Sequence, residues 1–132
     1  MPAAVTLIED NSLRATLDGF EVKVRLNWYR SLPLSCVEQV SLVLNGQVIE
    51  KDAISFAVNG HVYRVQDMLS LIGEYWYVQD SAILQVRQPG LVASGESHTI
   101  EAEITLRAPY ILVGPGKFLT MPTRYASVQV AA

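Results

Sequence analysis

The stretch FEVKVRLNWYRSLPLSCVEQVSLVLNGQVI, residues 20–49, decides the fold. From Phe20 to Trp28 apolar and polar residues alternate, which is typical of a strand that packs one face against a core. After a loop, a second alternating run begins at Val40 and reaches Asn45-Gly46, a strong hairpin signal. The stretch therefore predicts antiparallel strands separated by a loop that is unusually apolar.

The same pattern recurs on both sides of this stretch. Asp18-Gly19 and Asn59-Gly60 predict two more two-residue hairpin turns. The run from His98 to Arg107 alternates most cleanly, with Ile100 and its even-numbered neighbours directed toward a core. A last edge strand is expected from Tyr125 to Val130.

The segment from Asp67 to Gly73 is the one place that predicts a helix, a short one with Asp67 as its cap. Roughly eight or nine closely spaced strands with so little helix are typical of a sandwich. We therefore predict one all-β domain over residues 1–132, an antiparallel two-sheet β-sandwich with one short helix. A closed barrel is the second choice.

Composition narrows the functional class. The net charge is −3, with acidic and basic residues interspersed, which argues against a nucleic-acid-binding patch or a polybasic membrane tether. Half of the residues are hydrophobic and the mean hydropathy is +0.23, which favours an assembly that covers some apolar surface. No segment approaches the roughly 20 apolar residues of a membrane span.

Two further features suggest a cytoplasmic protein. The N-terminal residues from Met1 to Val5 lack the basic and apolar regions of a signal peptide. Cys36 is the single cysteine, so neither an internal disulfide nor a cysteine zinc site is expected. We expect Cys36 to be a small buried side chain, because no base flanks it.

Candidate catalytic groups are sparse. His61 and His98 lack a second histidine or a carboxylate at metal-ligand spacing, and both are expected to be exposed turn residues. Glu101 and Glu103 would lie about 7 Å apart on one strand face, which is typical of a solvated surface. The sequence thus predicts no catalytic residue and no metal ligand in this chain.

The apolar loop from Trp28 to Leu34 allows two interpretations. Aromatic and arginine side chains often anchor protein interfaces, which would make the loop a docking surface. The same side chains could instead plug one end of the sandwich. The residues alone do not decide between them.

Four segments of the chain, read in order, resemble a known family. They are RLNWYRSLPLSCVEQVSLVLNGQVI at 25–49, ISFAVNGHVYRVQDM at 54–68, YWYVQDSAILQV at 75–86 and GESHTIEAEITLRAPYI at 95–111. Together they are similar to the small β subunit of bacterial C-glycoside deglycosidases over about residues 12 to 112. Nothing is carried over to residues 113–132.

The resemblance implies a non-catalytic subunit of a lyase complex. Members of this family are β-sandwich subunits that pair with a larger α subunit, which resembles the TIM barrel of sugar-phosphate isomerases. The α subunit is expected to hold a divalent metal, typically manganese, together with the acid and base residues. The complex would cleave the carbon–carbon bond of a 3-oxo-C-glucoside by elimination, with no cofactor in the β subunit itself. The aglycone, which could be a flavonoid, and the linkage position stay open.

The predicted partner-binding residues form or support one surface around the apolar loop. They are Arg25, Trp28, Tyr29, Arg30, Leu32, Pro33, Leu34, Arg107 and Tyr110. A stand-alone sugar-binding module is the alternative, with Tyr75, Trp76 and Tyr77 stacking on sugar rings. A lyase that acts alone through His98 and Glu101 is a third possibility.

Overall fold

The computed structural model describes residues 8–26 and 30–132. Their strands form two larger sheets and one small one, and every neighbouring pair of strands is antiparallel. The five-stranded sheet has the order β1 (Arg14–Ala15), β2 (Phe20–Arg25), β9 (Ser81–Val86), β6 (Ile54–Val58) and β7 (His61–Arg64). The four-stranded sheet has the order β11 (Lys117–Val130), β10 (Ser97–Gly114), β4 (Val37–Leu44) and β5 (Gln47–Val48). The small sheet pairs β3 (Leu32–Pro33) with β8 (Tyr75–Trp76).

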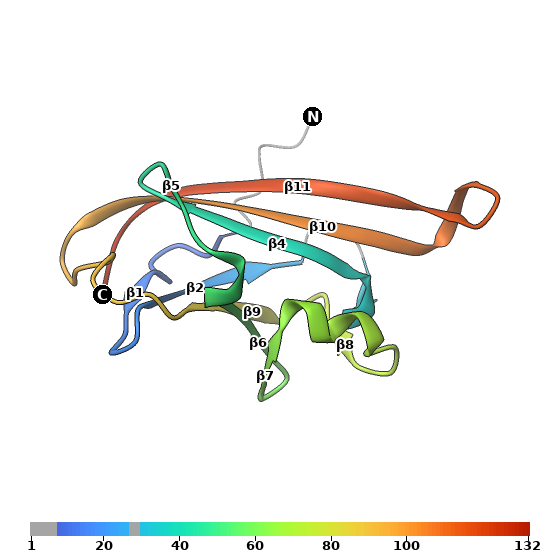
Figure 1. Cartoon of the computed structure of the whole chain (residues 1–132), viewed down its shortest axis with the longest axis horizontal. Coiled ribbons are helices and arrows are strands. Elements are labelled where there is room, and N and C mark those ends of the chain that lie inside the picture. Colours follow the sequence, from blue (N-terminus) through green and yellow to red (C-terminus); the bar gives the residue numbers. More distant parts are fainter. Residues whose placement is uncertain (1–7, 27–29) are drawn as a thin grey trace.

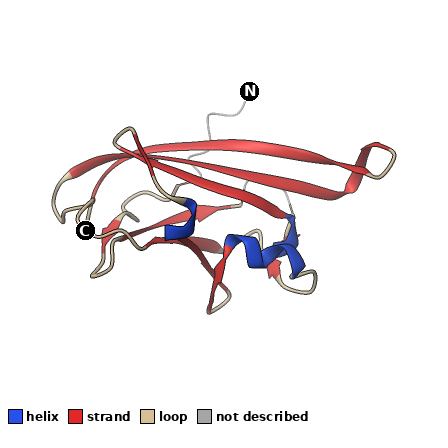
Figure 2. Cartoon of the chain, viewed as in Figure 1, coloured by secondary structure: helices blue, strands red, loops and turns tan. Residues whose placement is uncertain are grey.

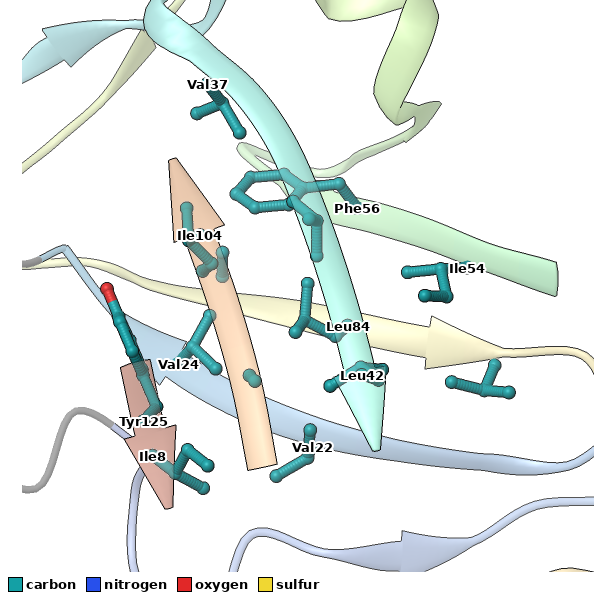
Figure 3. Packing of buried hydrophobic residues seen from close by; sticks show 14 of the residues in the cluster. Ile8, Val22, Val24, Val37, Leu42, Ile54, Phe56, Leu84, Ile104 and Tyr125 are labelled. Carbon is teal, nitrogen blue, oxygen red and sulfur yellow. The ribbon is translucent and has the colours of Figure 1, made fainter. Parts of the chain in front are cut away.

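The two larger sheets lie face to face as the layers of a sandwich (Figure 1). Their inward side chains meet in one core, to which Val24, Phe56 and Leu84 come from one sheet and Leu42 and Ile104 from the other (Figure 3). Strands β2, β4, β6 and β9 largely alternate buried positions with half-buried or exposed ones, as the sequence pattern predicts. The predicted all-β sandwich is confirmed, and the described strands do not close into a barrel.

Two of the three predicted tight turns have the expected form. Asn45 and Gly46 have φ of 50° and 83°, and Asn59 and Gly60 have φ of 55° and 77°. Positive φ at both central residues is the requirement of the type I′ hairpin turn, which Asn-Gly satisfies at little cost.

The turn predicted at Asp18-Gly19 lies one residue earlier. Thr16 and Gly19 exchange backbone hydrogen bonds of 2.9 and 3.4 Å around Leu17 and Asp18, and Ala15 pairs with Phe20 beyond them. Gly19 is required there for space, since a Cβ would lie 2.0 Å from the carbonyl oxygen of Val86. The two-residue turn and the hairpin are therefore present, but the predicted position of the turn was wrong by one residue.

Helical structure among the described residues consists of short 3-10 segments. They are η1 (Leu34–Cys36), η2 (Lys51–Ala53) and η3 (Val65–Ser70), coloured blue in Figure 2. No described helix has the length and apolar character needed to cross a bilayer.

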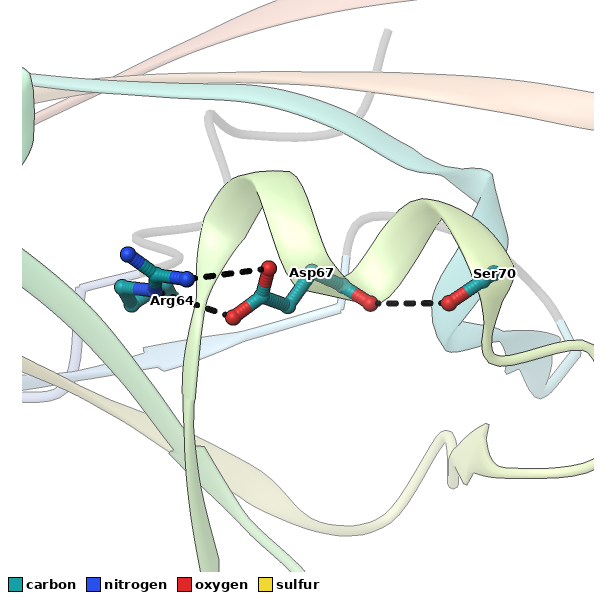
Figure 4. Close-up of polar contacts among 3 residues, drawn as sticks. All are labelled: Arg64, Asp67 and Ser70. Carbon is teal, nitrogen blue, oxygen red and sulfur yellow. Dashed lines mark hydrogen bonds and ion pairs between the residues drawn. The ribbon is translucent and has the colours of Figure 1, made fainter.

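The expected helix over 67–73 is thus shifted, and its predicted cap was wrong. The Asp67 carboxylate accepts hydrogen bonds from Arg64 Nε at 3.0 Å and from Nη2 at 3.4 Å (Figure 4). The Ser70 hydroxyl donates to the Asp67 carbonyl oxygen at 3.3 Å. Asp67 therefore ties η3 back to the end of β7 instead of capping a helix.

The final hairpin is longer than the sequence pattern indicated. β11 begins at Lys117, eight residues before the expected start at Tyr125, and a turn at Pro115 and Gly116 joins it to β10. Pro122 lies within β11 and lacks an N–H, which is tolerated because β11 is an edge strand. Figure 1 shows that β10 and β11 extend together beyond the rest of the sandwich.

Candidate partner-binding surface

From Ser31 onward, the loop that follows β2 is held by backbone pairing and hydrogen bonds. Leu32 pairs with Trp76, and the Leu34 amide donates to the Glu74 carbonyl oxygen at 2.7 Å. Directly before Leu32, the Ser31 hydroxyl oxygen accepts a hydrogen bond from the Val78 amide at 2.9 Å. The loop from Arg30 to Cys36 is therefore fixed against residues 71–78, although they are distant in sequence.

The two leucines of this loop belong to the core. Leu32 is 1% exposed and Leu34 is fully buried, whereas Pro33 between them is half-buried. Their neighbour Trp76 is also buried and packs edge-on against Phe56, with ring centroids 5.2 Å apart. The described part of the loop thus plugs the end of the sandwich, and Leu32 and Leu34 support the surface from beneath.

Arg107 braces the loop from the neighbouring sheet. Its Nη2 donates to the Ser35 carbonyl oxygen at 3.3 Å, and its Nη1 lies 3.5 Å from Glu38 Oε2. A planar guanidinium can bind a carbonyl and a carboxylate at the same time, as this arrangement requires. The contact links β10 to η1 and β4.

Arg30 and Tyr110 also come together. The Arg30 guanidinium carbon lies 4.8 Å from the centre of the Tyr110 ring, within the range of a cation–π contact. Arg25 is exposed at the end of β2, and its carbonyl oxygen accepts a hydrogen bond from the Tyr125 hydroxyl at 3.2 Å. Trp28 and Tyr29, the other predicted partner-binding residues, lie outside the described residues. The role of all these residues in partner binding stays a prediction.

Exposed apolar side chains gather at this end of the sandwich, and we call their set the apolar end. Part of it follows η3, and part lies on the projecting β10–β11 hairpin (Figure 1). The apolar end comprises Ile72, Tyr75, Tyr77, Val78, Tyr110, Leu112, Val113 and Phe118. Sequence reasoning missed Ile72, Leu112, Val113 and Phe118. Their signal was available, because residues 104–132 contain no aspartate or glutamate, and Lys117 is the single charged residue from Ala108 to Leu119.

The structure bears on both alternative readings. Trp76 is buried and its Nε1 donates to the Asp80 carbonyl oxygen at 2.9 Å, so it cannot stack on a sugar as the sugar-binding alternative required. Tyr75 and Tyr77 are exposed, and their rings stack with centroids 6.2 Å apart. His98 and Glu101 occupy opposite faces of β10, one buried and one exposed, so they do not form a joint acid–base site.

The expectation that His98 is exposed was wrong. It lies two residues before buried Ile100, on the same face of β10. Its Nδ1 lies 2.8 Å from Asn45 Nδ2 in the β4–β5 turn. His61 is exposed, as predicted.

Cys36 is buried, also as predicted, and burial raises the pKa of its thiol despite the opposing effect of Arg107. Within residues 8–26 and 30–132, no three or more His, Cys, Asp or Glu side chains cluster as metal ligands would.

Comparisons with known proteins identify relatives of this chain. It is 35% identical over 115 residues to the 3'-dehydrocarminate deglycosidase beta subunit of a Microbacterium species, covering 87% of this chain and 85% of the relative. It is 32% identical over 111 residues to a C-glycoside deglycosidase beta subunit of Arthrobacter globiformis, covering 83% of each. A C-glycoside deglycosidase beta subunit of Eubacterium cellulosolvens is 38% identical over 79 residues, which is 60% of this chain and 54% of the relative.

The family described as C-glycoside deglycosidase beta subunit matches residues 5–110. That range contains both larger sheets except β11 and the end of β10, and it includes the loop and its braces. The chain therefore belongs to the C-glycoside deglycosidase beta subunit family.

Proposed function

We propose that this chain is the small, non-catalytic β subunit of a C-glycoside deglycosidase. The observation that carries the proposal is the family match over residues 5–110, together with relatives that are all named beta subunits. The apolar end supports it, because a concentration of exposed apolar side chains is typical of an interaction site. Its partner would be a larger α subunit with a TIM-barrel fold.

The chemistry would belong to that partner. The substrate is a 3-oxo-C-glucoside, in which the 3-keto group acidifies the proton on C2 of the sugar. Removal of this proton by a base, and protonation of the departing aryl carbon by an acid, would break the carbon–carbon bond as an elimination. A divalent metal, manganese in our expectation, would supply charge stabilisation on the sugar oxygen. We assign the metal to the partner because the described residues of this chain offer no set of ligands for it.

The role of this chain would be to hold the larger subunit in its working form. Leu32 and Leu34 fill the end of the core, and Arg107 ties β10 to η1 and β4. The surface outside them is therefore presented on a fixed base. A preorganised surface loses less conformational freedom when it binds, which favours a stable complex.

Co-expression tests the proposal. The chain is produced with the α subunit of its source organism and, separately, without it, and the mass of each product is measured by light scattering. Both preparations are then assayed with a 3-oxo-C-glucoside and Mn²⁺. We expect a hetero-oligomer and release of the aglycone with the partner present, and neither with this chain alone. Turnover by the isolated chain, or failure of the two chains to associate, would contradict the proposal.

A further inference from the structure

The end of the β10–β11 hairpin leaves the sandwich as a two-stranded arm. β4 accompanies β10 only as far as Leu106, which pairs with Val37. Beyond that point β10 pairs with β11 alone, from Ala108 opposite Leu119 to Gly114 opposite Lys117. We call residues 108–119 the arm, which is the projecting tip in Figure 1. A two-stranded ribbon is only marginally stable in water, so this segment gains most from a binding partner.

The arm is apolar where it is exposed. Leu112 and Val113 are 63% and 62% exposed, and Tyr110 and Phe118 are 42% and 39% exposed. In β4 and in the first half of β10, side chains of this kind mostly face the core. Exposed apolar surface that is continuous, instead of scattered singly, is typical of an interaction site.

The root of the arm is anchored to the sandwich. Between the Ala108–Leu119 and Leu112–Phe118 pairs the register shifts, so residues 109–111 form a bulge on β10. A bulge re-aims side chains, and the ring of Tyr110 lies here against the Arg30 guanidinium. Arg107, at the base of the arm, binds the Ser35 carbonyl oxygen. The arm thus projects in a defined direction from the same surface as the apolar loop.

Charge indicates what kind of groove the arm fits. Arg107 and Arg124 form ion pairs with Glu38 and Glu103. Lys117 on the arm and Arg30 at its root form no ion pair with any carboxylate among the residues that the structure describes. A complementary partner would therefore offer an apolar groove with carboxylates at its rim. A second copy of this chain fits poorly, because two arms in contact would bring like charges together.

The arm is too short to form an interface by itself. It pairs Ala108 to Gly114 of β10 with Lys117 to Leu119 of β11, so the ribbon is about 10 Å long. Each partner buries roughly 800 Å² in a standard interface, so the other exposed side chains of the apolar end, such as Ile72 and Tyr77, would contribute to the contact.

We propose that the arm inserts into an acid-rimmed apolar groove of the large catalytic subunit and is the main anchor of the complex. This inference rests on the proposed function and adds the element of this chain that holds the partner. It also assigns a role to residues 111–119, which lie beyond the family match.

The test compares matched aspartate variants in the full chain, each co-expressed with the α subunit. The arm variant carries Leu112→Asp and Val113→Asp. The control variant carries Leu17→Asp and Val48→Asp, whose side chains are 100% and 73% exposed at the opposite end of the molecule (Figure 1). We expect the arm variant to weaken the complex by about 100-fold or more, as for two anchor residues, and the control to stay within about threefold. Both should unfold at the wild-type temperature, because all four side chains are exposed.

A second variant keeps the test informative if aspartates disturb the hairpin. Residues 109–118 are replaced by Asn-Gly, which joins Ala108 to its pairing partner Leu119 through a tight turn. This shortened chain should fold as a monomer and should not bind the α subunit. Lys117→Glu should also weaken binding, by about tenfold at low salt and less at high salt, whereas Lys51→Glu on η2 should not.

The outcomes separate this inference from the proposed function. If wild type and arm variants bind the α subunit equally well, the arm assignment is wrong and the subunit role stands. If wild type forms no complex with the α subunit, the proposed function fails and the arm assignment fails with it. If the chain alone is a dimer that the arm variant converts to a monomer, the arm is a self-association element, which also overturns the proposal.

Discussion

The two halves of β10 have opposite environments within one continuous strand. From Ser97 to Leu106 the strand has a neighbour on each side for most of its length, and Ile100, Ile104 and Leu106 are completely buried. From Arg107 to Gly114 it keeps only β11, and its large apolar side chains become exposed. The difference teaches that the loss of one neighbouring strand converts a core element into a surface available for binding.

The two halves differ in composition and in patterning. The first half alternates apolar residues with threonine and glutamate, so its outer face is polar. The second half reads Ala-Pro-Tyr-Ile-Leu-Val from residue 108, with no polar alternation. A strand that is apolar on both faces needs cover on both faces, yet Leu112 and Val113 near the tip of the arm are more than 60% exposed.

The largest expected effect is a direct comparison of one leucine from each half. Leu106→Ala should lower the free energy of unfolding by about 2–5 kcal/mol, because it removes a fully buried side chain and leaves a cavity. Leu112→Ala should change it by less than about 0.5 kcal/mol, because that side chain is already in solvent. Urea unfolding of the isolated chain measures both. Equal losses would show that the arm is part of the folded core.

The second prediction concerns Cys36, which follows the apolar loop in η1 and is buried like the first half of β10. Burial raises the pKa of its thiol above the ordinary value, so the folded chain favours the protonated form. The contribution to stability is therefore complete below about pH 8.5, where an ordinary thiol is protonated. It is lost as the pH rises toward the higher folded-state pKa, because the unfolded chain then releases a proton that the folded chain keeps.

The measurement is the difference in unfolding free energy between wild type and Cys36→Ala from pH 7 to 10. The difference should be constant up to about pH 8.5 and then shrink by at most about 1.4 kcal/mol per pH unit. Lysines and tyrosines that titrate in the same range are present in both proteins, so their contributions cancel in the difference. A difference that does not vary with pH would mean that the thiol reaches solvent in the folded chain.

Much of the sandwich could be predicted because its signals are local. Period-two alternation identifies the inward face of each strand, and Asn-Gly fixes the register of two hairpins. The same rule applied two residues before Ile100 would have placed His98 inside. The start of β11 could not be read in this way, because Phe118 to Pro122 lacks alternation and becomes a strand only by pairing with β10.

The candidate surface was predictable in part. Arg107 and Tyr110 were singled out from the family resemblance, and the structure places them against Ser35 and Arg30, while their role in partner binding stays a prediction. The burial of Leu32 and Leu34 did not follow, because an apolar loop can face either a core or a partner. Only the pairing of Leu32 with Trp76 decides this point. The arm was missed because exposure depends on where β4 stops, which is a property of the folded sheet.

The smallest effect compares two arginines that flank the boundary between the halves. Arg107 is braced against Ser35 and Glu38 with its side chain 31% exposed, whereas Arg124 reaches Glu103 with its side chain 85% exposed. Arg107→Ala should cost about 1 kcal/mol of unfolding free energy, because it leaves a half-buried carbonyl and carboxylate without their donor. Arg124→Ala should cost less than about 0.5 kcal/mol, as for an exposed ion pair. Arg107→Lys separates the two contributions, because it keeps the charge but loses the planar fork. If Lys restores full stability, the brace acts through charge alone, and the Ser35 carbonyl contact does not hold the loop against β10.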